Sequence, residues 1–268
     1  MIEKDKTYIV MGLLDPDSIA YAIGTTLQRF GARVIYTAQS ERMRGIFLDR
    51  DGRLSEEELA ALDIRYCDVT REDELQALFE ALPMPISGVV HSIAYANPKT
   101  CLGEEFHTSE AADILKAFEI SCVSFAHVAR HAAPRMADGG SLLALTFDTS
   151  RVYPYYNWMG VNKAALEALV RALARRHGRD RIRVNAISAG PLFSKAASKI
   201  PGFGKLDRIW NASSPLPWDP LSDKQSVADA AAFLLGPCAK KITGQILPVD
   251  GGASIVAGEL MEFERPTA

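Results

Sequence analysis

The amino-acid sequence predicts a doubly wound α/β domain, built on a seven-stranded parallel sheet with helices on both faces. Short apolar runs alternate along the chain with longer segments of helical periodicity. Parallel strands that are buried on both faces need apolar runs of this kind, and helices usually make the crossovers between them. The 268 residues suffice for a single domain over residues 1–268, and the chain contains no internal repeat and no linker-like stretch.

The first half of the chain contains four of the expected strands. A helix should follow the first strand, with Ser18 at its start, because a serine side chain can accept a hydrogen bond from the first turn. Between the second and third strands, an Asp51-Gly52 turn precedes Ser55 and Glu58, which have the spacing of a capping box. We expect strands over residues 8–11, 34–37, 64–67 and 88–91, and helices over 18–30 and 72–81.

The second half continues the alternation with longer helices. A long helix is expected over residues 111–132, and another begins at Tyr156. We expect strands over 141–145, 182–187 and 245–249, and a last helix over 227–235. Right-handed crossovers between such strands give a Rossmann-like doubly wound sheet, in which ligands bind at the carboxyl ends of the strands.

Composition excludes several classes of function. The formal net charge is −3 and there is no basic run, so neither nucleic acid nor an anionic membrane is an expected partner. No apolar run approaches the length of a membrane span and the first residues do not resemble a signal peptide, so we expect a cytoplasmic protein. The four cysteines form no C-x-x-C pair. His127 and His131 lie one helical turn apart without a third ligand, so no metal site is expected.

Tyr156 and Lys163 are the most informative pair of residues. Seven positions on a helix are close to two turns, so both side chains should project from one face. A phenol is a proton donor, and a nearby ammonium favours its ionisation and eases proton transfer. The lysine can also donate hydrogen bonds to a sugar diol. An ordinary amphipathic helix explains the pair equally well, so its context has to decide.

The end of the first strand is a candidate phosphate site. Gly12 lets the backbone approach a ligand closely, and Ser18 stands where helix amides and the helix dipole attract pyrophosphate. The segment is not a G-x-G-x-x-G motif, because only Gly12 and Gly24 are glycine. Alone, it is also consistent with an ordinary strand–helix turn.

Five motifs in order point to one family. They are Gly12-x5-Ser-Ile-Ala, His91-Ser-Ile-Ala, Tyr156-x6-Lys, Asn185-Ala-Ile-Ser-Ala-Gly-Pro and Val249-Asp-Gly-Gly. The series resembles the enoyl-acyl-carrier-protein reductases, a divergent branch of the short-chain dehydrogenase/reductases, over nearly the whole chain. Most short-chain enzymes space the tyrosine and lysine four apart. The stretch from Phe147 to Arg151, with Asn157-Trp-Met, is most similar to the mycobacterial members.

The resemblance implies reduction of the 2,3 double bond of enoyl thioesters in fatty acid synthesis, with NADH as cofactor. It implies Tyr156 as the donor to the thioester oxygen, Lys163 on the nicotinamide ribose, and Phe147 where many relatives carry a second catalytic tyrosine. The cofactor-binding residues that it implies are Gly12, Ser18, Ile19, Gln39, Asp68, Val69, Ser92, Ile93, Lys163, Leu192 and Ser194. Those implied around the acyl chain are Tyr95, Ala96, Tyr156, Met159, Ala197 and Phe203, the last two in a mobile segment at about 193–215.

The resemblance also implies partners and an assembly. The substrate would be an enoyl chain on acyl carrier protein or coenzyme A. The helices over 111–132 and 156–177 would form a homotetramer, and the alanine-rich face of the second permits close approach. Discrimination for NADPH needs cations just after the second strand. Because Ala38-Gln39-Ser40-Glu41 is neutral and then acidic there, the sequence predicts a preference for NADH.

Some residues depart from the family, and two alternatives stay open. Phe193 stands where relatives usually carry arginine, and the segment over 194–215 is too short for an extended lid, so very long acyl chains are not expected. A carbonyl reductase of the short-chain type, such as a 3-oxoacyl reductase, would need a serine thirteen residues before the tyrosine, and that residue is Leu143. A catalytically silent nucleotide-binding sensor is the other alternative, disfavoured by the presence of both Tyr156 and Lys163.

Overall fold

A seven-stranded, all-parallel sheet forms the centre of the molecule, with the strand order β3-β2-β1-β4-β5-β6-β7. The computed structural model describes residues 1–83, 85–195, 197–200 and 202–260. The sequence prediction of a doubly wound parallel sheet is confirmed. The strands are β1 Thr7–Met11, β2 Arg33–Ala38, β3 Asp63–Tyr66, β4 Gly88–His91, β5 Gly140–Thr146, β6 Ile182–Ala189 and β7 Ile246–Val249.

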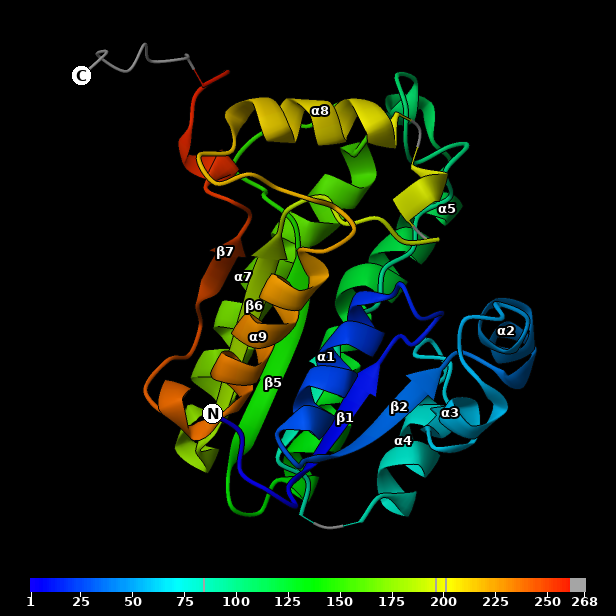
Figure 1. Cartoon of the computed structure of the whole chain (residues 1–268), viewed down its shortest axis with the longest axis vertical. Coiled ribbons are helices and arrows are strands. Elements are labelled where there is room, and N and C mark those ends of the chain that lie inside the picture. The colour runs from blue at the N-terminus through cyan, green and yellow to red at the C-terminus, as the bar shows by residue number, and fades with distance from the viewer. Residues whose placement is uncertain (84, 196, 201, 261–268) are drawn as a thin grey trace.

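Helices cover both faces of this sheet (Figure 1). They are α1 Ile19–Arg29, α2 Glu41–Arg44, α3 Glu56–Ala60, α4 Glu72–Ala81, α5 Ala111–Phe118, α6 Ser124–Ala132, α7 Asn157–His177, α8 Phe203–Ser213 and α9 Lys224–Leu235. Alternate residues of a strand point to opposite faces. In β1, Val10 therefore packs in the core beneath α1 and α9. Its neighbours Ile9 and Met11 pack in the second core, beneath α4, α6 and α7.

The glycine and capping signals have direct structural counterparts. Gly24 in α1 faces strand β2, where a Cβ would lie 2.1 Å from the Tyr36 hydroxyl, so only glycine allows this helix–sheet approach. The predicted capping box of α3 is confirmed, since Ser55 Oγ accepts from the Glu58 amide at 3.2 Å and Glu58 Oε2 accepts from the Ser55 amide at 2.8 Å. Predicted strand ends agree with the structure to within about two residues, the usual uncertainty of such boundaries.

Two segments differ from the sequence prediction. The helix expected over 111–132 is interrupted by a π-helical turn at Glu119–Val123, which joins α5 to α6. A π turn contains one residue more than an α turn but uses the same kinds of residue, so helical periodicity does not reveal it. The segment over 193–215, for which the sequence analysis expected mobility and no helix, contains α8, which lies at the carboxyl end of the sheet (Figure 1); its mobility stays a prediction.

None of the described helices is long and apolar enough to cross a membrane.

Candidate active site

Tyr156 immediately precedes helix α7, beside the carboxyl end of strand β5. The residue has helical backbone angles, with φ −87° and ψ −31°, but the helix begins at Asn157. Phe147, one residue beyond β5, packs against the Tyr156 ring with 4.8 Å between the ring centroids. Thr146, the last residue of β5, is buried. Tyr156 is therefore the last residue of the β5–α7 connection, and its ring packs against Phe147, the first residue of the same connection.

Lys163 carries a buried ammonium in the second turn of α7. Lys163 is 5% exposed, and its Nζ donates to the Leu145 carbonyl at 2.7 Å. Burial lowers the pKa of Lys163 to about 8, against the opposing influence of Cys122 and Glu167. An ammonium has three donors. Within the described residues only the bond to Leu145 uses one, so the others can bind the hydroxyls of a ligand.

The surroundings of Tyr156 favour the protonated phenol. Burial raises the pKa of Tyr156 above its ordinary value. The expectation that Lys163 would promote ionisation is wrong, because the ammonium is directed at Leu145 and its own charge is disfavoured by burial. A phenol that keeps its proton at neutral pH is a hydrogen-bond donor, which suits stabilisation of a developing oxyanion.

The loop between β5 and α7 is fixed by Glu167. Its Oε1 accepts from the Thr146 hydroxyl at 2.9 Å, and its Oε2 accepts from the Thr149 hydroxyl at 2.8 Å. Glu167 lies one turn beyond Lys163 on α7, on the same side of the helix. The Glu167 carboxylate therefore bonds to the chain both before and after Phe147, at Thr146 and Thr149. It also lies near enough to the Lys163 ammonium to influence its pKa.

An aromatic cluster of Phe147, Tyr153, Tyr156 and Trp210 connects this loop to helix α8. Trp210 of α8 lies 5.2 Å from Phe147 and 5.4 Å from Tyr153 between ring centroids. It is 1% exposed, and its Nε1 donates to the Asp250 carbonyl at 2.9 Å. The Tyr153 hydroxyl donates to Asp148 Oδ2 at 2.6 Å. The position of α8 is therefore coupled to the ring that packs on Tyr156.

The loop after β1 is shaped for close approach. Gly12 has φ +95°, in the left-handed region that favours glycine, and a Cβ there would lie 2.2 Å from the Ser92 carbonyl oxygen. Ser18 caps α1, with its Oγ accepting from the Tyr21 amide at 3.2 Å. Ile19 begins the helix, and Ile93 follows Ser92 after β4. The structure brings these five predicted residues together at the carboxyl ends of the neighbouring strands β1 and β4.

Gln39 and Asp68 form the other end of the predicted cofactor site. They follow β2 and β3, and Gln39 Nε2 donates to Asp68 Oδ2 at 2.9 Å. Val69, next in sequence, is buried. A cavity of about 710 Å³ reaches both Gln39 and Asp68, but most of its lining comes from β3 and α4. It therefore overlaps the predicted adenosine site only at one end.

The loop after β6 carries Leu192 and Ser194, the last two of the predicted cofactor-binding residues. Leu192 is buried, and Ser194 Oγ accepts from the Ala197 amide at 3.0 Å, which closes a short turn. Phe193 packs edge-on against Phe203, with 6.2 Å between centroids. Two of the predicted acyl-contacting residues therefore contact this loop: Ala197 bonds to Ser194, and Phe203 packs on Phe193.

The other predicted acyl-contacting residues lie after β4 and on α7. Tyr95 is 40% exposed, and its backbone amide and carbonyl both bond to Ser121 Oγ at 2.9 Å. Ala96 follows it and is half-buried, and Met159 is buried in the first turn of α7. Residues that the sequence analysis missed are Asp148, Tyr153, Glu167 and Trp210. The contacts of Glu167 and Trp210 join residues far apart in sequence, whereas Asp148 and Tyr153 bond to each other across five positions of the loop.

The residues at the carboxyl ends of the strands fit a nicotinamide dinucleotide. Only a glycine leaves room between the first and fourth strands, a capped helix begins beside it, and a buried ammonium with spare donors lies further along the same edge. These features occur in the order in which a dinucleotide would meet them across a doubly wound sheet.

Comparison with known proteins agrees with this geometry. A family profile described as Enoyl-(Acyl carrier protein) reductase matches residues 12–254. The chain belongs to the enoyl-acyl-carrier-protein reductase family. It is an oxidoreductase of fatty acid synthesis. The NADH enzyme of that name from Bacillus cereus is 38% identical over 255 residues, which cover 94% of this chain and 97% of the relative.

Other enoyl reductases extend the comparison. The NADPH enzyme of Staphylococcus aureus is 36% identical over 253 residues, covering 93% of this chain and 96% of the relative. Among solved structures, the Anaplasma phagocytophilum reductase in complex with NAD has a TM-score of 0.86 at 32% identity, covering 97% of this chain and 100% of that chain. The Bacillus cereus reductase with NADP+ and indole naphthyridinone has a TM-score of 0.83 at 36% identity, covering 95% and 98%. Relatives thus differ in their nicotinamide cofactor.

Proposed function

We propose that this enoyl reductase uses NADH to reduce the 2,3 double bond of an enoyl thioester, with Tyr156 as the donor to the thioester oxygen. The observation that carries the proposal is the half-buried, protonated Tyr156, which packs on Phe147 and is followed along α7 by the buried Lys163 ammonium. The reduced nicotinamide supplies hydride to C3 of the enoyl chain. Negative charge then develops on the thioester oxygen, where a preorganised donor has its largest effect.

The protein residues have separate tasks in this scheme. Tyr156 donates a hydrogen bond to the oxygen as it becomes an enolate, and Tyr156 or solvent then protonates C2. Lys163 binds the ribose hydroxyls with the donors not used by Leu145. Phe147 acts by packing, since its ring has no polar atom, and it sets the orientation of the tyrosine. Glu167 holds the loop that carries Phe147.

The cofactor would lie from Gln39 and Asp68, past Gly12 and Ser18, to Lys163, with Leu192 and Ser194 beside its nicotinamide half. NADH should be preferred over NADPH. A 2′-phosphate near Gln39 would meet the Asp68 carboxylate to which Gln39 is bonded, and Glu41 begins the next helix. The cation of Arg44 is already paired with Asp49 at 3.1 Å. Steady-state kinetics should give the higher kcat/KM with NADH, and a higher value with NADPH would overturn the preference.

The acyl chain would lie between Tyr95, Ala96 and Met159 on one side and the segment over 193–215 on the other. We propose that this segment, with α8, moves to admit the chain. The buried contacts of Trp210 with Phe147 and Tyr153 give it a defined resting position. The substrate carrier would be acyl carrier protein, as in the names of the relatives, or coenzyme A.

We further propose a homotetramer built on α5, α6 and α7. Leu115 on α5 is 64% exposed and Val161 on α7 is 51% exposed, although both are large apolar side chains. On α7, Ala164 and Ala168 are exposed one turn apart, and small residues permit close approach of a second helix.

The test of the reaction is a matrix of enoyl and 3-oxoacyl thioesters against NADH and NADPH. Each thioester is offered on acyl carrier protein and on coenzyme A. Oxidation of NADH that depends on an enoyl thioester supports the proposal. Turnover of only the 3-oxoacyl thioesters would identify a carbonyl reductase instead, and cofactor binding without any turnover would identify a silent nucleotide-binding protein.

A further inference from the structure

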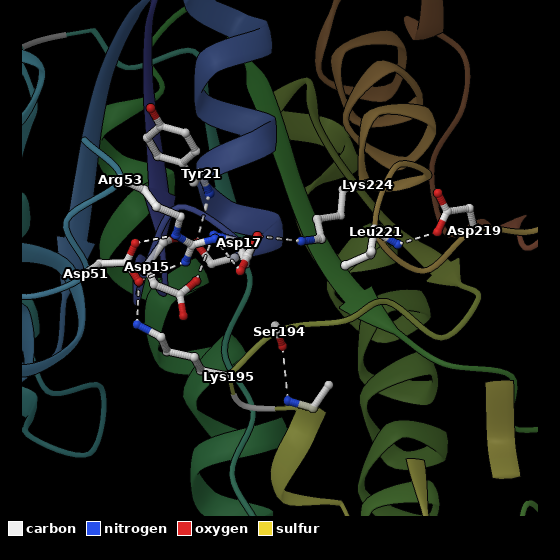
Figure 2. A network of polar contacts seen from close by, with 12 residues as sticks. Asp15, Asp17, Tyr21, Asp51, Arg53, Ser194, Lys195, Asp219, Leu221 and Lys224 are labelled. Atoms are coloured by element: carbon white, nitrogen blue, oxygen red, sulfur yellow. Dashed lines mark hydrogen bonds and ion pairs between the residues drawn. The ribbon is translucent and has the colours of Figure 1, made fainter. Parts of the chain in front are cut away.

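Ion pairs connect four separate segments at the carboxyl end of the sheet (Figure 2). Asp17 lies between β1 and α1, Asp51 and Arg53 lie between β2 and α3, Lys195 follows β6, and Lys224 begins α9. Arg53 pairs with both Asp51 and Asp17, reaching Asp17 Oδ2 at 2.6 Å. Lys224 pairs with Asp17 Oδ1 at 3.2 Å.

The pair between Lys195 and Asp51 crosses the sheet. Lys195 Nζ lies 2.5 Å from Asp51 Oδ2 and donates to the Phe47 carbonyl at 3.2 Å. The connection that carries Asp51 starts from β2, and the loop that carries Lys195 starts from β6. In the sheet, β1, β4 and β5 separate these two strands. The pair therefore bridges the carboxyl edge on which a dinucleotide would lie.

Asp51 is the buried partner of this pair, whereas the Lys195 side chain is 38% exposed. The Asp51 side chain is 5% exposed, and the guanidinium of Arg53 binds the same carboxylate. Lys195 is adjacent to Ser194 in sequence, and the Ser194 carbonyl and hydroxyl both accept bonds from the next turn. A contact that fixes Lys195 therefore also restricts the movement of Ser194, the residue before it. Phe193 carries no charge, so Lys195 is the first cation in the loop that follows β6.

We propose that Lys195 and Asp51 form a clasp over the nicotinamide dinucleotide, which holds Leu192 and Ser194 against the cofactor and slows its release. The clasp rests on the dinucleotide site of the proposed function. Lys195 is a positioning residue, because its ammonium contacts Asp51 and Phe47 and acts on the cofactor through its neighbours in sequence. Removing one partner of a hydrogen-bonded charge pair whose carboxylate is buried acts mainly on dissociation rates.

The clasp is tested by the dissociation rate of NADH from the full-length protein, followed by stopped-flow fluorescence after displacement with excess NAD+. Lys195→Met should raise this rate on the order of tenfold. Asp51→Asn should do the same, and the double variant should release NADH no faster than either single variant, since all three lack the same contact. Lys195→Arg should restore slow release. Lys224→Met, which removes a cation from the same cluster without breaking the bridge, is the matched control and should leave the rate unchanged.

Each other outcome counts against the clasp. A Lys195→Met protein with an unchanged dissociation rate would overturn it, and so would single-variant effects that multiply in the double variant. Melting temperatures of all variants identify any general loss of structure. Failure of the proposed function is a separate result: wild-type protein that binds NADH but does not reduce enoyl thioesters would refute the reaction, while the dissociation rates would still test the clasp.

Discussion

At the scale of single residues, the tyrosine hydroxyl is the group on which the reaction depends most. Tyr156→Phe keeps the ring that packs on Phe147 and removes only the donor. We expect kcat to fall by roughly 10²–10³-fold, the usual effect of losing one oxyanion donor, with NADH affinity nearly unchanged. A hydrogen bond from the cofactor's ribose hydroxyl to the same oxygen would make the decrease in kcat smaller. Steady-state kinetics and NADH titration on the same preparation measure both quantities.

Phe147→Ala provides the comparison for that variant. Because Phe147 has no polar atom, its removal should mainly raise the KM for the acyl substrate. Normal turnover in a well-folded Tyr156→Phe protein would exclude the hydroxyl from the mechanism. Loss of activity in both variants in proportion to their melting temperatures would instead indicate that the residues are only structural.

Lys163 makes cofactor binding depend on pH. With a pKa of about 8 in the free protein, the side chain loses its charge as the pH rises through that value. If the charged form binds the cofactor, NADH affinity should fall roughly tenfold between pH 7 and 9. Fluorescence titrations across that range measure it, and Lys163→Met should bind weakly with a flat profile. A wild-type affinity that does not change with pH contradicts the assignment.

The lowered pKa of Lys163 also affects stability. Whereas cofactor affinity should fall as the pH rises, the contribution of Lys163 to stability should increase. The folded protein releases the Lys163 proton near pH 8, whereas an unperturbed lysine releases it at 10.5. Between these values the unfolded chain binds more protons, so the contribution of Lys163 to the free energy of unfolding increases with pH. Below pH 8 the buried charge reduces stability.

At the scale of elements, Trp210 holds helix α8 to the rest of the molecule. Trp210→Ala should lower the free energy of unfolding by about 3–5 kcal/mol, as for other buried tryptophans, and raise the acyl KM. Trp210→Phe retains most of the packing and removes one of the two donors to the Asp250 carbonyl, which keeps the Ala253 amide, at a cost of about 0.5–1.5 kcal/mol. Denaturant unfolding measures both values. Wild-type stability in both variants would mean that α8 is held by other contacts.

At the scale of the whole molecule, assembly is the property most open to test. The exposed apolar residues Leu115 and Val161 should be covered by neighbouring subunits. We expect light scattering at micromolar concentration to give the mass of a tetramer. Val161→Glu, which places a charge on that face of α7, should shift the protein to smaller species. A wild-type monomer would rule out the proposed assembly.

The sequence was sufficient to predict the sheet, and the physical reasons are local. Periodicity over a few residues located β4 and α4, and the spacing of Ser55 and Glu58 predicted a capping box. The pair of Tyr156 and Lys163 was visible because both lie within two turns of one another. By contrast, the contacts of Trp210 with Phe147, and of Lys195 with Asp51, join residues far apart in the chain. No local pattern encodes such contacts.

The π-helical turn between α5 and α6 determines the directions in which the side chains of α6 point relative to those of α5. It presents Ser121 to the backbone of Tyr95, while Ser124, three residues later, bonds to the His91 ring at 2.8 Å. In a regular helix each residue advances the direction of its side chain by about 100°. Deleting one residue from Glu119–Val123 would therefore turn α6 by about that angle relative to α5, and one of the two serines would lose its partner. Between these two helices, the number of residues is constrained as strictly as their identity.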